Sequence, residues 1–226
     1  MKRSISCFTL ILLCGFVLAS CGKKSDAPGG AAGGSTEAPA GSKYSMKAGI
    51  GEGYMEMMGQ KLQMKLAFDD FGAKSSSEMS GEMMGQKMHQ LTITKDGYTY
   101  QLDLTKNTGS KHKSNERDNM DFRNMTPEQM KAQGIMATGA DSVINGKECK
   151  VYTIDPSANQ KTPSKGGPEM KGRVWIWNGI PMKMEMGTMM KMEMTKMETS
   201  APASSAFDVP ADVKVSELPE NPPAMK

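Results

Sequence analysis

Apolar and polar residues alternate along several short stretches of the chain, most clearly between residues 61 and 69. Leu62, Met64, Leu66 and Phe68 alternate there with the polar residues Lys61, Gln63, Lys65 and Asp69. The same period recurs over residues 98–104 and 182–186. A period of two places successive side chains on opposite faces of a strand. These stretches therefore predict antiparallel strands with one buried face and one solvated face.

Turn signals separate these stretches. Asp96-Gly97, Asn145-Gly146 and Asn178-Gly179 suit type I′ hairpins, in which both central residues need a positive φ. Gly59-Gln60 and Gly85-Gln86 suit type II′ turns. The last two lie in an identical hexapeptide, Glu-Met-Met-Gly-Gln-Lys, found at 56–61 and at 82–87. This repeat predicts two successive hairpins.

One short helix is expected after Thr126, which offers a capping hydroxyl before Pro127, with Gln129 at the third helical position and Gly134 as a stop. Residues 107–124 and 155–171 are polar and predict surface loops, and the end after Leu218 predicts a loose tail. The fold class is therefore mainly β. About ten strands form an antiparallel curved sheet or an incomplete β-barrel with one short helix.

The first residues have the parts of a secretion signal: Lys2 and Arg3, then an apolar run from Ile5 to Leu18. That run is shorter than the roughly 20 residues that span a bilayer. Leu18-Ala19-Ser20-Cys21 resembles the lipobox of bacterial lipoproteins. The resemblance implies cleavage between Ser20 and Cys21, several acyl chains on Cys21, and a stable membrane anchor. The residue after the acylated cysteine is Gly22 and not aspartate, which resembles lipoproteins sent to the outer membrane. The sequence leaves open whether the domain faces the periplasm or the outside of the cell.

The chain then divides by composition. We expect a signal peptide at 1–20, the acylated cysteine with a flexible linker at 21–42, an antiparallel β domain at 43–218 and a loose tail at 219–226. Without Lys2 and Arg3 the mature chain has 26 basic against 25 acidic residues. This balance gives no reason to expect a nucleic-acid partner.

Three segments of the β domain carry a second resemblance: 144–152, 174–183 and 206–210. They resemble a family of envelope lipoproteins that is similar in outline to the lipoprotein carriers LolA and LolB. The resemblance implies an incomplete β-barrel around an apolar hollow. It supplies no catalytic residues. It identifies none of the carriers' ligand-binding positions in this chain, so lipoprotein transport itself does not follow from it.

Methionine is unusually abundant, with 24 in 226 residues. The densest tract predicts two strands joined at Gly187-Thr188. Six methionines alternate along them, and they are the candidate ligand-binding residues: Met182, Met184, Met186, Met190, Met192 and Met194. Methionine could simply replace leucine and valine on the inward face, or it could line an adaptable pocket for acyl chains. The third interpretation is Cu(I) binding, because thioether sulfur is a soft ligand.

Other candidate chemistry is sparse. Copper sites usually include histidines, and these are scarce here. The chain has two, His89, which is expected in the core, and His112, which is expected in a lysine-rich loop. Cys149 is the thiol left after signal removal and acylation, and we expect it to be a buried structural residue. Asp69-Asp70 fits a turn better than a carboxylate pair. Trp175 and Trp177 alternate with Val174 and Ile176, which predicts a strand that is apolar on both faces.

No nucleophile, zinc or phosphate-loop motif occurs. The sequence therefore favours a non-enzymatic envelope lipoprotein without a cofactor, whose partners are the membrane and an apolar ligand or lipidated protein. Two alternatives stay open, a copper-handling protein and a structural lipoprotein without a small ligand.

Overall fold

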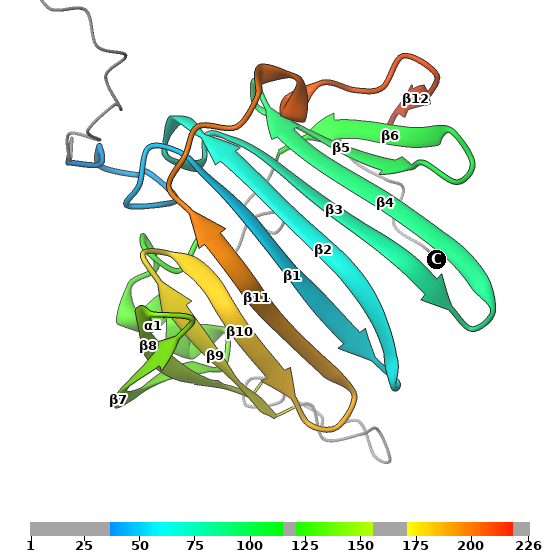
Figure 1. Ribbon diagram of the computed structural model, residues 1–226. Helices are drawn as coiled ribbons and strands as arrows, with labels where there is room; N and C mark the ends of the chain where they lie inside the picture. The colour runs from blue at the N-terminus through cyan, green and yellow to red at the C-terminus, as the bar shows by residue number, and fades with distance from the viewer. Residues whose placement is uncertain (1–36, 115–120, 156–170, 219–226) are drawn as a thin grey trace, which may run out of the picture. The chain divides into compact units, whose positions relative to one another are not determined.

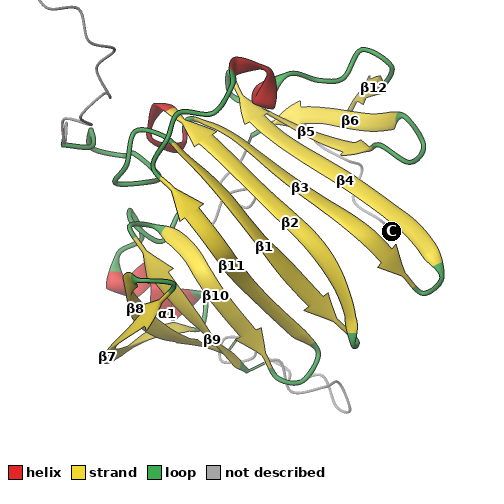
Figure 2. Ribbon diagram, in the orientation of Figure 1, coloured by secondary structure: helices red, strands yellow, loops and turns green. Residues whose placement is uncertain are grey.

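The computed structural model describes residues 37–114, 121–155 and 171–218. Its strands form a single twelve-stranded sheet, in the order β12-β6-β5-β4-β3-β2-β1-β11-β10-β9-β8-β7 (Figures 1 and 2). The strands are β1 (Gly49–Met57), β2 (Gln60–Asp69), β3 (Lys74–Met83), β4 (Gln86–Lys95), β5 (Tyr98–Asp103), β6 (Thr108–Lys113), β7 (Ile135–Ile144), β8 (Lys147–Ile154), β9 (Gly172–Trp177), β10 (Ile180–Met186), β11 (Met190–Glu198) and β12 (Lys214–Glu217).

The sheet consists of two meanders, β1 to β6 and β7 to β11, that join where β1 pairs antiparallel with β11. β12 and β7 form its two edges, so the curved sheet does not close into a barrel. The predicted fold class is confirmed. The predicted count of about ten strands was too low, and one reason is that residues 108–113, predicted as loop, form β6. This polar strand is stabilised by pairing with β5 on one side and with parallel β12 on the other.

The hairpin turns confirm three predictions and correct two. Asp96, Asn145 and Asn178 have positive φ, as do the glycines that follow them. The two repeat turns were placed one residue too late, because their positive-φ pairs are Met58-Gly59 and Met84-Gly85. They are thus turns of the type I′ kind, with methionine where asparagine or aspartate is usual. The prediction of two hairpins from the repeat is confirmed by β1–β2 and β3–β4.

The predicted helix is α1 (Pro127–Ala132), with the expected capping box. The Thr126 side chain accepts a hydrogen bond from the Gln129 backbone at 3.2 Å, and the Gln129 side chain accepts one from the Thr126 backbone at 2.8 Å. Gly134 follows with a φ of +73°, which ends the helix. Asp69-Asp70 has the turn role that was expected, since Asp69 Oδ1 caps the short 3-10 segment η1 (Asp70–Gly72).

Buried side chains gather on both faces of the sheet. One cluster contains Phe68 of β2 and Met192 of β11, together with Tyr44 and Trp175. Another contains Ile93 of β4 and Leu102 of β5, covered by Val213 and by Phe207 of η3 (Ser204–Phe207). The register places Ile93 and Leu102 on the face opposite to Phe68 and Met192. The segment after β11 therefore buries a second core on the other side of the sheet.

β9 is apolar on both faces, as predicted. Val174 and Ile176 pack in a third cluster with Phe122 and, at its margin, Met130 of α1, whereas Trp175 belongs to the first cluster. Several predictions concern residues outside those described. They are the signal peptide, Ser20 and Cys21, most of the linker, the loop over 156–170 and the tail 219–226. These stay predictions.

Candidate functional site

The methionine tract folds as the alternation predicted, into β10 and β11. Their register pairs Met184 with Met192 and Met186 with Met190, and it pairs Lys183 with Glu193 and Glu185 with Lys191. The same register thus places methionine opposite methionine on one face of the hairpin and lysine opposite glutamate on the other face. Cross-strand pairs of both kinds stabilise a sheet, which explains why this tract forms a defined hairpin.

β1 adds further methionines to the same face. Met55 pairs with Met192, and Met57 pairs with Met190. Two rows of paired residues therefore cross the sheet from β9 to β2. They are Val174–Met184–Met192–Met55–Leu62 and Gly172–Met186–Met190–Met57–Gln60. We call the face that bears these rows the methionine face.

The sequence analysis missed Met55 and Met57. Their Met-x-Met spacing was visible, but β1 and β11 are more than 130 positions apart in the chain and nothing local indicates that they pair. Of the six candidates, Met184, Met186, Met190, Met192 and Met194 lie on the methionine face by register. Met182 lies in a bulge of β10 between Pro181 and Lys183 and is fully buried.

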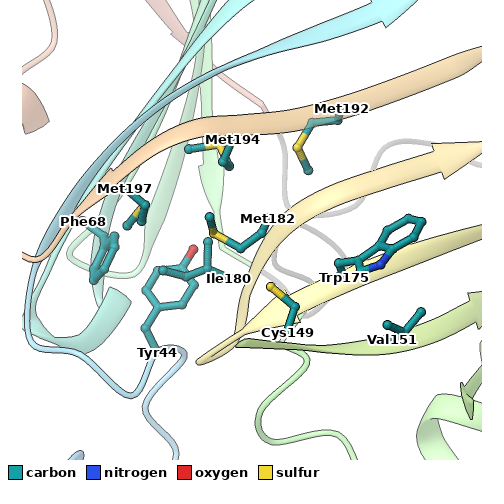
Figure 3. Packing of buried hydrophobic residues seen from close by; sticks show 10 residues of the cluster. All are labelled: Tyr44, Phe68, Cys149, Val151, Trp175, Ile180, Met182, Met192, Met194 and Met197. Carbon is teal, nitrogen blue, oxygen red and sulfur yellow. The ribbon is translucent and has the colours of Figure 1, made fainter. Parts of the chain in front are cut away.

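Burial divides these methionines into two groups. Met182 and Met194 are 0% and 1% exposed, and Figure 3 shows them with Met192, Ile180 and Cys149 in one packed group. Half-buried methionines, Met55, Met64 and Met184, pack against that group. The buried members act as core, which agrees with the interpretation of methionine as an ordinary apolar residue. The half-buried members form a thioether surface beside it.

Glycines on β1 leave room for the buried methionines. A Cβ at Gly51 would overlap the terminal methyl of Met194, and a Cβ at Gly53 would overlap the backbone oxygen of Glu193. Both glycines point to the methionine face. Here the strand backbone itself forms the floor of the core.

The other face of β10 and β11 carries charge. Lys183 Nζ lies 2.8 Å from Glu185 Oε1, and Lys191 Nζ lies 3.5 Å from Glu193 Oε2. The hydrogen bond from Lys183 holds the pKa of Glu185 below its usual range. On this face Lys183 also pairs with Trp175 of β9, and Lys183 Nζ lies 4.7 Å from the centroid of the Trp175 ring.

Two cavities lined by described residues lie at the end of the sheet where the hairpins turn, and another lies elsewhere. One of about 170 Å³ is lined by Met57, Met58, Gln60, Met83 and Met84. Another of about 190 Å³ lies beside it and shares Met58, with lining from Glu185 and 187–191. The third, of about 570 Å³, is lined by Lys43, Asp70, Asp121 and neighbouring residues. Burial lowers the pKa of Lys43, and Asp121 opposes this effect.

Cys149 is a buried free thiol, as expected, with 1% exposure. Its Sγ donates to the Lys147 carbonyl at 3.4 Å, and burial raises its pKa. A buried thiol with a raised pKa is a poor nucleophile. The thiol is therefore a core residue.

His89 is half-buried, and its Nε2 lies 2.7 Å from Glu78 Oε1. His112, predicted in a loop, lies in β6 opposite Thr99. Among the described residues, no group of three or more His, Cys, Asp or Glu side chains could hold a metal ion. Within the same ranges, no helix is long and apolar enough to cross a membrane.

No protein-family model matches the chain, and no curated protein matches it. Among solved structures, it resembles an uncharacterized conserved protein from Thermus thermophilus, with 7% identity over 76% of this chain and 91% of that chain and a TM-score of 0.50. It also matches MucB of Pseudomonas aeruginosa, solved in complex with MucA, with 14% identity over 76% of this chain and 58% of that chain and a TM-score of 0.44.

The likeness to the Thermus protein shows a shared fold and leaves the function of this chain open. The two MucB structures match with TM-scores of 0.44 and 0.45, and this likeness is too low to indicate any property of this chain. The resemblance to LolA and LolB remains a prediction in everything beyond an open, curved β-sheet.

Proposed function

We propose that this chain is a non-enzymatic envelope lipoprotein, anchored through the acylated Cys21 in the outer membrane, whose methionine face binds an apolar ligand or the acyl chain of a lipidated partner. The observation that carries the proposal is the pair of methionine rows across β10, β11 and β1. Unbranched thioether side chains adapt to irregular apolar shapes, which suits ligands without a fixed outline.

The burial of these residues supports a contact surface. Met55, Met57, Met184 and Met190 are half-buried, so part of each side chain is accessible at the surface of the described residues. Apolar surface that a ligand covers contributes about 25 cal/mol per Å² to binding. The opposite face of β10 and β11 carries charged side chains, so an apolar ligand would bind at the methionine face.

Ligand binding is tested with the full-length protein purified in detergent. Organic extraction should release a co-purified lipid, and the delipidated protein should take up a fluorescent fatty acid. Replacing Met55 by Lys should weaken this uptake about ten-fold or more, because a charge would lie within the row. Gln63→Lys is the matched control, since Gln63 is exposed on the opposite face of β2.

Equal uptake by the two variants would refute binding at the methionine face, and no uptake by the unchanged protein would refute ligand binding altogether. The anchor is tested separately by labelling growing cells with palmitate. The unchanged chain should carry the label and sediment with outer membranes, and Cys21→Ser should do neither.

A further inference from the structure

The two copies of the repeated hexapeptide meet at one end of the sheet. They place Met57 and Met58 at the turn of β1–β2, and Met83 and Met84 at the turn of β3–β4. These four methionines and Gln60 line the cavity of about 170 Å³. Two turns separated by 26 positions in the sequence thus bring four thioethers around one space.

Hydrogen bonds fix the two turns in place. The Met84 backbone donates to Gln60 Oε1 at 2.7 Å, which links one repeat to the other. The Met58 backbone donates to the Met189 carbonyl at 3.1 Å, which links the first turn to the β10–β11 hairpin. The thioethers around the cavity are therefore carried by anchored turns.

The positions of Met58 and Met84 are unusual for core methionines. They are 71% and 78% exposed, so burial does not explain them. Their φ angles are +52° and +53°, in the left-handed region that favours glycine and asparagine. The three turns at Asp96, Asn145 and Asn178 use the residues expected there. Methionine stands at an unfavourable exposed position in both repeats, which points to a role for its sulfur.

We propose that Met57, Met58, Met83 and Met84 form a binding site for Cu(I). Thioethers are soft, uncharged ligands that select Cu(I) over Mg²⁺, Ca²⁺ or Zn²⁺. No carboxylate, imidazole or thiol lines this cavity among the described residues, so hard cations find no preferred ligand. Binding would use three or four sulfurs and would release no proton. The site differs from the six tract methionines and does not depend on the apolar-ligand proposal.

The test is a titration of the full-length protein with Cu(I) under anaerobic, reducing conditions against the chelator bicinchoninate. The unchanged protein should bind one Cu(I) with micromolar or tighter affinity. A variant with leucine at positions 57, 58, 83 and 84 should bind Cu(I) at least about ten-fold more weakly. Leucine keeps the size and apolar character of methionine and removes the sulfur, so a loss of Cu(I) binding would come from the missing thioethers.

The matched control replaces four other methionines by leucine, at positions 55, 64, 184 and 192. This variant should keep its Cu(I) affinity within about two-fold. Absence of micromolar binding by the unchanged protein would overturn the proposal. So would equal binding by the variant with leucine at the four turn positions.

A second measurement locates the metal directly and does not need the variants to fold. Protein labelled with ¹³C at the methionine methyls is titrated with Ag(I), a redox-stable substitute for Cu(I). The methyl signals of Met57, Met58, Met83 and Met84 should shift, while those of the buried Met182 and Met194 should not. Shifts confined to the tract methionines would overturn the turn site in favour of copper binding at the tract.

Discussion

The two faces of the sheet have cores of different composition. On the methionine face, Met192 and Met194 pack in one cluster with Phe68, and Met194 lies over the glycines of β1. On the opposite face, Ile93, Leu102, Phe207 and Val213 form a cluster in which none of the described members is methionine. Branched and aromatic side chains have few rotamers and specify one arrangement, whereas methionine adapts to gaps. One sheet thus combines a stiff core that holds the fold with a soft face that can change shape.

This comparison predicts different costs for the same truncation on the two faces. Ile93→Ala should lower the free energy of unfolding by about 4 kcal/mol, and Met192→Ala by about 2 kcal/mol, because neighbouring methionines can move into the space left by Met192. Urea unfolding followed by circular dichroism measures both. Equal losses would show that the two cores are equally rigid.

Two glycines of β1 sharpen the same contrast. Gly53→Ala should cost about 3 kcal/mol, because the new Cβ meets the backbone oxygen of Glu193, which cannot move aside. Gly51→Ala should cost less than about 1 kcal/mol, because its Cβ meets the flexible ends of Met194 and Met197. Unfolding curves of the two variants provide the test. A larger loss of unfolding free energy for Gly51→Ala than for Gly53→Ala would show that the methionine face is not adaptable.

Mild peroxide treatment should separate the methionines by exposure. Met58 and Met84 should form sulfoxides first, and Met182 and Met194 last, as measured by peptide mass spectrometry. Oxidation limited to the two exposed residues should change the free energy of unfolding by about 0.5 kcal/mol or less. The cluster around Ile93 contains no described methionine, so hydrogen exchange in β4 and β5 should stay unchanged. Early oxidation of Met194 would show that the methionine face opens readily.

The smallest expected effect concerns the turn beside the stiff core. Asp103 accepts hydrogen bonds from the Thr105 side chain and backbone and pairs with Lys106 Nζ at 3.0 Å, which lowers its pKa to about 2. A carboxyl whose pKa falls on folding stabilises the fold above its unfolded pKa of about 4. That contribution is lost as the pH falls towards 2.

Asp103→Asn should therefore lower the unfolding midpoint slightly at neutral pH, and the difference from the unchanged protein should shrink between about pH 4 and pH 2. Thermal unfolding across this pH range measures it. A difference that stays constant with pH would show that the carboxylate charge does not contribute.

The candidate site was predictable where its contacts are local. The alternation from Met182 to Met194 and the turn at Gly187-Thr188 were enough to place β10 against β11, because a short connection favours an antiparallel partner. The capping residues around Pro127 similarly predicted α1. The polar strand β6 was missed, because it forms through its partners and has no apolar face.

The sequence by itself determined the mainly β class, most hairpins, the short helix, the buried Cys149 and the face on which most of the tract methionines lie. Tertiary structure decided that β1 pairs with β11, which adds Met55 and Met57 to the methionine rows. It also brought the two Met-Met turns around one cavity and laid Phe207 over the opposite face. The physical reason is that a period of two specifies which side chains share a face of a strand, but the choice of a distant neighbouring strand depends on packing of the whole sheet.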